Sequence, residues 1–191
     1  MNVLRLPWLR RALAMALLPL AACDTESALG PEDTLALAAA SRSAVRAPDL
    51  GSCDSLRAPE GSILAFRAYA EGVQVYRYTG SGWTFNGPIA TLYADADGHG
   101  VVGTHFGGPT WEFNSGGFIV GELSKRCNVA PADIPWLLLR VVRNEGPGVF
   151  RGVTHIQRVN TSGGQFPTGG GYAGEVRTVS YRAEYYFYRA P

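Results

Sequence analysis

Turn-forming residues interrupt the chain from about residue 60 onward, and their regular spacing limits the fold more than any other feature of the sequence. The runs between them are short and rich in Val, Ile, Phe, Tyr and Trp, which are typical of β-strands. The 24 glycines and 12 prolines in 191 residues favour tight turns over long helices. Turns at intervals of about 8–12 residues predict an all-β domain of roughly eight or nine strands. We expect an antiparallel β-sandwich or a small barrel, jelly-roll-like in its connections.

Runs of residues with a β pattern underlie the expected strands. These runs cover residues 62–70, 73–79, 83–85, 89–93, 101–106, 111–113, 118–123, 134–142, 149–160 and 176–189. Glu71 and Gly72 are expected to form a hairpin turn between the first two ranges. Residues 161–174 are uncharged and rich in glycine, and we expect this loop to form a mobile rim or lid.

The charge distribution excludes one class of partner. The chain has a formal net charge of +1 and only 17% charged residues, and its basic residues do not gather in a stripe. Nucleic-acid binding needs a concentrated positive surface to neutralise phosphates. We therefore expect no nucleic-acid partner.

The first 22 residues have the features of an export signal. Three arginines precede an apolar run over residues 12–22, which is too short to span a bilayer core of about 30 Å. The sequence Leu20-Ala21-Ala22-Cys23 resembles the bacterial lipobox, in which the cysteine thiol is diacylated and the signal peptide is then cleaved just before it. We expect a lipoprotein signal peptide (1–22) and a membrane anchor on Cys23, in either the inner or the outer membrane. An ordinary secretory signal is the alternative, and it also exports the chain.

The remaining two cysteines define the expected organisation of the exported part. Residues 23–56 are rich in Ala and Ser and are expected to form a flexible tether, and residues 57–191 a single β domain. Cys53 and Cys127 are available as a disulfide in an oxidising compartment, or as two free thiols. A bridge between them would close a loop of about 75 residues and stabilise the fold by up to roughly 4 kcal/mol.

The segment from Val101 to Phe113 contains the best candidates for chemistry. A four-residue hairpin loop over residues 107–110 would place Phe106 and Trp111 on the core face. His105 and Glu112 would then lie opposite each other on the other face, with Cβ atoms about 5 Å apart. Such a pair suits proton transfer or half of a metal site. The alternative is an exposed cross-strand pair with no function.

Other side chains extend these hypotheses. A metal site at His105 and Glu112 needs further ligands, and His155, Asp95, Asp97 and His99 are the available donors, without diagnostic spacing. Asp95 and Asp97 are better explained as part of a turn. Outward-facing aromatic residues on a sheet can stack on sugars or apolar ligands, and Trp111, Tyr186 and Tyr188 are the candidates. Such residues also serve as core and cross-strand contacts.

Several motifs between residues 58 and 189 resemble an uncharacterised bacterial and fungal family, domain of unknown function 3455. The matching stretches are residues 58–61 (APEG), 72–76 (GVQVY), 90–93 (ATLY), 108–112 (GPTWE), 134–138 (IPWLL), 156–161 (IQRVNT) and 185–188 (YYFY). The resemblance implies an exported single domain of mostly β structure. It brings no established activity.

These observations lead to two expectations about function. The first is a membrane-tethered envelope module that is structural or binds a glycan or a small hydrophobic ligand. The second is a metal-assisted or acid/base enzyme centred on His105 and Glu112. We expect no cofactor, because the sequence has no complete cofactor or catalytic motif.

Overall fold

The computed structural model describes residues 46–191, which belong to one compact unit of the chain. The predicted signal peptide, Cys23 and most of the predicted tether lie outside the described residues. Within residues 46–191, no helix has the length and apolar character needed to cross a membrane.

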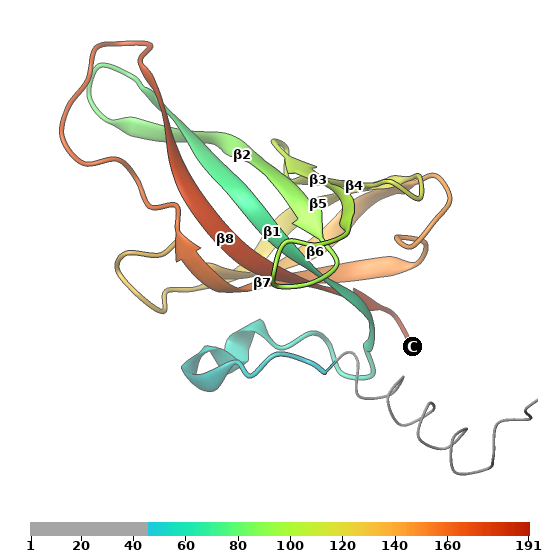
Figure 1. Ribbon diagram of the computed structural model, residues 1–191. Helices are drawn as coiled ribbons and strands as arrows, with labels where there is room; N and C mark the ends of the chain where they lie inside the picture. The colour runs from blue at the N-terminus through green and yellow to red at the C-terminus, as the bar shows by residue number, and fades with distance from the viewer. Residues whose placement is uncertain (1–45) are drawn as a thin grey trace, which may run out of the picture. The chain divides into compact units, whose positions relative to one another are not determined.

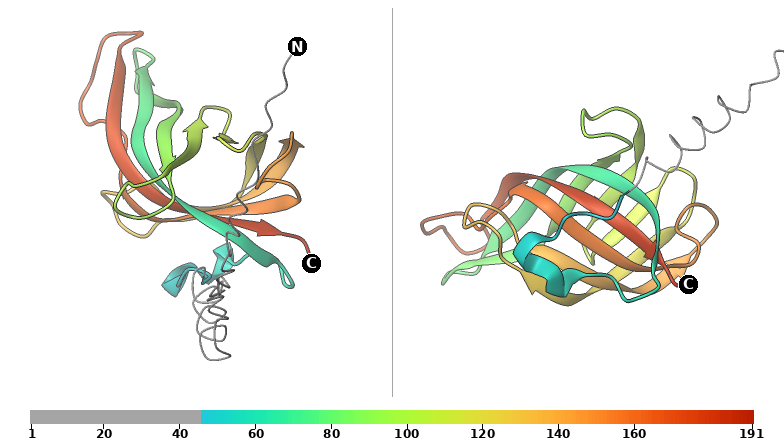
Figure 2. Two further views of the ribbon diagram at one scale, coloured as in Figure 1. Left: turned by 45° about the vertical axis from the view of Figure 1, so that its right-hand side comes forward. Right: turned by 90° about the horizontal axis from the view of Figure 1, so that it is seen from below.

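Eight antiparallel strands make up the domain, and a single 3-10 helix precedes them (Figure 1). The elements in chain order are η1 (Gly51–Leu56), β1 (Ile63–Tyr78), β2 (Trp83–Tyr93), β3 (Val101–Phe106), β4 (Thr110–Phe113), β5 (Phe118–Cys127), β6 (Trp136–Glu145), β7 (Val153–Gly163) and β8 (Val176–Arg189). Each strand pairs with the next, and β8 pairs with β1, so the sheet curls round and closes on itself (Figure 2).

The closed sheet confirms the all-β prediction and decides between its two architectures. The domain is a small barrel, and the order of its strands in the sheet is their order in the chain. This simple meander differs from jelly-roll connectivity, in which strands that are distant in sequence are neighbours. In this barrel every connection joins two strands that are neighbours in the sheet.

Strand β1 corrects the prediction of a hairpin turn at Glu71 and Gly72. Both residues lie inside one continuous strand and pair with β2 on one side and β8 on the other. Gly72 is needed there because β1 and β2 come very close at this point. A Cβ atom on Gly72 would lie 2.5 Å from the Cα atom of Ala90. The glycine therefore permits close packing of two backbones, which a sequence pattern cannot distinguish from a turn.

Side chains on the inner face of the barrel form its main hydrophobic core. One end of the barrel is filled by the rings of Phe66, Phe113, Phe150 and Phe187, with neighbouring ring centroids 4.4–5.8 Å apart. Phe66 is near the start of β1 and Phe187 near the end of β8, so this cluster closes the end of the barrel where these strands begin and finish.

A second hydrophobic cluster lies on the outside of the sheet, where η1 covers it (Figure 2). Leu50, Cys53 and Leu56 are buried against outward-facing side chains of β6, β7 and β8, including Leu138 and Val159. The packed part of the chain therefore begins before residue 57, where the flexible tether was expected to end. This packing was not predicted, because the segment has no strand pattern and only Leu50 and two residues of η1 are buried.

The disulfide between Cys53 and Cys127 is present and confirms that prediction. It joins η1 to the end of β5, with Cα atoms 5.8 Å apart. Because disulfides persist in oxidising environments, this bond indicates an extracytoplasmic location.

Candidate ligand-binding site

A large cavity opens at the end of the barrel opposite the phenylalanine cluster. Its volume is about 840 Å³, within the range of about 300–1,000 Å³ that is typical of small-molecule sites. Strands β1, β2, β5 and β6 and the loop after β7 provide its mainly apolar wall. The lining includes Tyr76, Phe85, Leu123, Ile134, Leu137 and Phe166.

Large hydrophobic side chains at this cavity remain open to solvent. Phe85, Leu123, Val129 and Phe166 all line the cavity, and each exposes 47–52% of its surface. Contiguous exposed apolar side chains around a cavity are typical of ligand-binding grooves.

A smaller cavity adjoins the large one. Its volume is about 290 Å³, and the two cavities share the lining residues Phe85, Pro109, Leu137, Leu139 and Arg158. The wall of the smaller cavity also includes the buried side chains of His105, Trp111 and Tyr185. A largely apolar cavity therefore adjoins one with several buried polar groups.

His105 and Trp111 form a stacked pair inside the barrel, which corrects the predicted hairpin register. His105 pairs with Trp111 and Thr104 with Glu112, because the loop between β3 and β4 has three residues and not four. A change of one residue in register moves every side chain of a strand to the other face. The predicted His105–Glu112 pair is therefore wrong: His105 is buried inside, and Glu112 is exposed outside.

The environment of His105 keeps its imidazole neutral. Burial lowers the pKa of His105 to about 3, and the positive charge of Arg158 acts in the same direction. The Nδ1 atom lies 2.8 Å from the carbonyl oxygen of Thr110, so Nδ1 carries the proton and donates it to that oxygen. An imidazole in this state is an aromatic wall of the cavity and not a proton donor in transfer chemistry at neutral pH.

Arg158 is the one strongly polar residue common to both cavities. Its side chain extends from β7 into the barrel and is only 9% exposed. Nε and Nη2 donate to the carbonyl oxygen of Pro135 over 3.2 Å and 2.8 Å. Arg158 takes part in none of the ion pairs within residues 46–191. A buried guanidinium group normally has a carboxylate partner, because an unpaired buried charge is costly.

Four further polar groups in the barrel lack a hydrogen-bond partner among the described residues. They are Nε2 of Gln74, Nε1 of Trp111 and the hydroxyl groups of Tyr181 and Tyr185. Burial raises the pKa of Tyr185 and of Tyr181, so both phenols are protonated and are able to donate. Unpaired buried polar groups are rare in folded proteins, and a cluster of them calls for an explanation.

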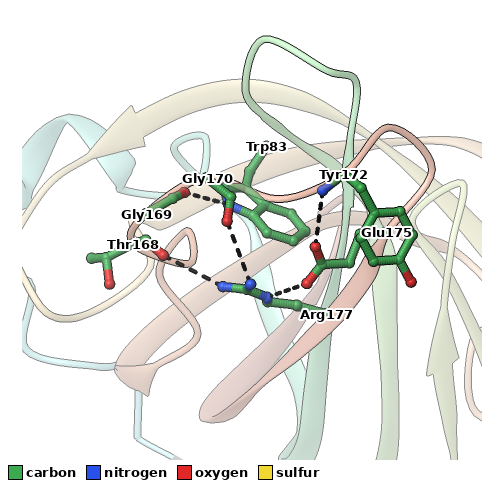
Figure 3. A network of polar contacts seen from close by, with 7 residues as sticks. All are labelled: Trp83, Thr168, Gly169, Gly170, Tyr172, Glu175 and Arg177. Atoms are coloured by element: carbon green, nitrogen blue, oxygen red, sulfur yellow. Dashed lines mark hydrogen bonds and ion pairs between the residues drawn. The ribbon is translucent and has the colours of Figure 1, made fainter.

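The glycine-rich loop after β7 is attached to the barrel by a network of polar contacts (Figure 3). Trp83 Nε1 donates to the carbonyl oxygen of Gly169 over 3.0 Å, and the guanidinium carbon of Arg177 lies 4.7 Å from the centre of the Trp83 ring. Arg177 also donates to Glu175 over 2.7 Å. The loop places Phe166 against Tyr76, with ring centroids 4.6 Å apart, so it forms part of the cavity wall as expected of a rim.

The region that contains the barrel matches one known protein family. A family model described as a protein of unknown function (DUF3455) matches residues 59–189. The chain belongs to the DUF3455 family. No curated protein and no solved structure matches it. In this DUF3455 chain the matched region contains all eight strands and both cavities, while η1 and Cys53 precede it.

The other predicted site residues of this DUF3455 chain do not meet in one place. His155 is half-buried on the outer face of β7, where burial and the charge of Arg140 lower its pKa. It therefore does not meet His105, which is inside the barrel, and the predicted metal set of His105, Glu112 and His155 is not formed. Tyr186 and Tyr188 are buried in the outer cluster beneath η1, and of the three aromatic candidates only Trp111 lines a cavity.

Asp95, Asp97 and His99 are the acidic and histidine residues that do come together in this DUF3455 chain. Their ligand atoms lie within 4.8 Å of one another in the turn between β2 and β3. Asp95 Oδ1 accepts hydrogen bonds from the backbone N–H groups of Asp97 and His99, over 3.0 Å and 2.9 Å. These bonds give the cluster a structural role in the turn, in agreement with the sequence prediction.

Three polar residues of the DUF3455 cavity were not predicted as site residues from the sequence, namely Arg158, Gln74 and Tyr185. In the β7 segment from His155 to Arg158, one face of the strand has the apolar Ile156 and the polar Arg158. The other face has His155 and Gln157, which are both polar. Such a pattern leaves the inner face undetermined. The pairing of Arg158 with Leu137 and Tyr185, both directed inward, is what places Arg158 in the barrel.

Proposed function

We propose that the chain is an exported binding module that holds a small, largely apolar ligand inside its barrel. The observation that carries this proposal is the cavity of about 840 Å³, whose four partly exposed hydrophobic side chains surround an opening to solvent. An eight-stranded barrel is just wide enough to hold one small ligand when side chains do not fill it. A glycan is less compatible with this interior, since sugars need many polar partners along their length.

A neutral fluorescent probe provides a direct test of this proposal. N-phenyl-1-naphthylamine becomes fluorescent in apolar surroundings and carries no charge, so its binding reports the apolar cavity alone. The strands, η1 and the disulfide all lie within the compact unit, so a chain that begins at Asp24 contains every element of the fold. Titration of this chain should saturate at one probe per molecule.

A matched pair of tryptophan substitutions locates the probe. Leu137 lines both cavities and Ile89 is 62% exposed on the outside of β2. Leu137→Trp should weaken probe binding at least tenfold by filling the cavity, whereas Ile89→Trp should leave it unchanged. Absence of saturable binding, or equal binding by both variants, would rule out a ligand inside the barrel.

We also propose that Cys23 carries a lipid that attaches the module to a bacterial membrane. The lipobox-like sequence Leu20-Ala21-Ala22-Cys23 supports this anchor, and the Cys53–Cys127 disulfide supports export. An inhibitor of lipoprotein signal peptidase should cause the uncleaved precursor to accumulate. Cys23→Ser should abolish the membrane fraction while the disulfide still forms. A precursor that is processed normally in the presence of the inhibitor would contradict lipidation.

A further inference from the structure

We infer that the ligand is an amphiphile with a carboxylate group, and that this carboxylate binds to Arg158 inside the barrel. This inference rests on the proposed function, since it specifies the chemistry of the ligand in the same cavity. Arg158 lines both the outer and the smaller cavity, so a ligand in the outer cavity is able to place its head group on Arg158 while its tail lies on the apolar wall.

Arg158 lacks a counter-charge. Its guanidinium group is 9% exposed, donates to the carbonyl oxygen of Pro135 and interacts with the Tyr185 hydroxyl group, and it has no carboxylate partner among residues 46–191. A guanidinium group has five N–H donors in a planar fork that fits a carboxylate in a bidentate manner. Two nitrogens satisfy Pro135, and donors remain available on the side of the cavity. A bound carboxylate would supply the missing charge.

The polar atoms that lack a partner around Arg158 are mainly hydrogen-bond donors. The unpaired atoms of Gln74 and Trp111 are N–H donors, and the hydroxyl group of Tyr185 is also able to donate. Gln74 lines the outer cavity, and Trp111 and Tyr185 line the inner one, as does Arg158. Among residues 46–191, those that line the two cavities thus offer several N–H donors and include no Asp or Glu, which is complementary to an acceptor-rich anion and unsuited to a cation.

The rest of the ligand must suit the apolar wall of the outer cavity. Phe85, Leu137, Leu139 and Phe166 line this cavity together with Arg158 and provide no charge. A small hydrophilic anion would leave this apolar wall uncovered, whereas an alkyl chain or an aromatic group would cover it. The combination describes a monocarboxylate with an apolar tail, such as a medium-chain fatty acid or an aromatic acid of similar size.

Three ligands of equal length separate the head group from the tail. Decanoate, 1-decanol and decylammonium share a ten-carbon chain and have an anionic, a neutral and a cationic head group, and each is titrated against the N-phenyl-1-naphthylamine complex of the chain beginning at Asp24. We expect decanoate to displace the probe at least tenfold more strongly than 1-decanol, and decylammonium to be the weakest. Equal displacement by all three would overturn the carboxylate assignment but leave the proposed function intact. Failure of the probe itself to bind would instead contradict the proposed function.

Two arginine variants test the assignment to Arg158. Arg126 also lines the outer cavity but is exposed, so it is a matched control. Arg158→Met should reduce the preference for decanoate over 1-decanol to less than threefold, and Arg126→Met should retain it. Loss of the preference in Arg126→Met alone would overturn the role of Arg158. If Arg158→Met does not fold, Arg158→Lys provides the test, since it keeps the charge but loses the bidentate fork, and it should retain only part of the preference.

Discussion

The imidazole of His105 stacks on the indole of Trp111, with ring centroids 4.2 Å apart and ring planes 10° apart. The two residues are directly opposite on β3 and β4, and Tyr185 meets both rings edge-on at 5.1 Å and 5.4 Å. Three aromatic side chains from three strands thus form the inner wall of the smaller cavity. This arrangement requires a neutral imidazole, since a charged one would be buried without a carboxylate.

The buried imidazole predicts that stability falls in mild acid. The pKa of His105 is about 3 in the folded protein and about 6.5 in the unfolded chain, so between these values only the unfolded chain takes up the proton. The stabilising contribution is complete above pH 6.5 and is lost as the pH falls toward 3. Between pH 7 and pH 5 we expect a loss of about 2 kcal/mol, at 1.36 kcal/mol per pH unit. Urea unfolding at pH 7 and at pH 5 measures this loss in the free energy of unfolding.

Substitution of two histidines provides the control for this pH effect. His105→Gln should abolish about 2 kcal/mol of the pH dependence while lowering stability at pH 7, because the stacked ring is lost. His99→Gln, at an exposed turn, should retain the full dependence. The interpretation fails if both variants have the same dependence as the natural chain.

The close contact of β1 and β2 predicts an unusually costly glycine substitution. In Gly72→Ala the new Cβ would meet the backbone of Ala90, and we expect a loss of about 1–3 kcal/mol in the free energy of unfolding. Gly82→Ala is the control, because no atom lies within 4 Å of its Cβ position, and the change should be within about 0.5 kcal/mol. Thermal unfolding of both variants measures the difference. Equal effects would mean that the strands separate easily at Gly72.

The disulfide is expected to stabilise the domain by attaching η1 to the barrel. Its two cysteines are 74 positions apart, and a loop of this size corresponds to a loss of up to about 4 kcal/mol when the bond is removed. The double variant Cys53→Ser, Cys127→Ser should therefore unfold at lower urea concentration. Adding a reductant should move the natural chain toward the variant and leave the variant unchanged. A natural chain that keeps its stability in reductant would contradict this role.

A buried hydrogen-bond chain beneath η1 leads to a further prediction. The Tyr188 hydroxyl donates to Gln157 Oε1 over 2.6 Å, and Gln157 Nε2 donates to the Leu56 carbonyl oxygen over 2.7 Å. Tyr188→Phe leaves the buried Oε1 atom without a donor, so we expect a loss of about 1–3 kcal/mol. Tyr172→Phe, at a side chain 74% exposed, should change stability by less than about 0.5 kcal/mol. Chemical unfolding that shows no difference between the two variants would contradict the network.

Local sequence patterns were sufficient to predict some features of this fold. The strand from Val101 to Phe106 has the predicted bounds, since alternation and the flanking turns define it. The barrel and the Cys53–Cys127 bond were among the predicted alternatives. Glu71 and Gly72 resembled a turn because a glycine that permits close packing has the same sequence pattern as a glycine in a hairpin.

The errors at the candidate site have a different origin. The faces of the β3 residues depended on the length of one hairpin loop, and a difference of one residue turned His105 inward and Phe106 outward, while Trp111 and Glu112 kept their predicted faces. The role of Arg158 depends on its neighbours across β6 and β8, which are distant in sequence. Local patterns therefore identified the strands, while the composition of the cavity was decided by how the strands pair around the barrel.

A crystal structure of the chain in complex with 10-bromodecanoate tests the central claim most directly, since anomalous scattering locates the bromine at the end of the tail. The account predicts one ligand inside the barrel, with its carboxylate oxygens within about 3 Å of the Arg158 nitrogens. The bromine should lie near the opening, between Leu123 and Phe166. A bromine bound only outside the barrel, or an interior without ligand at saturating concentration, would contradict it.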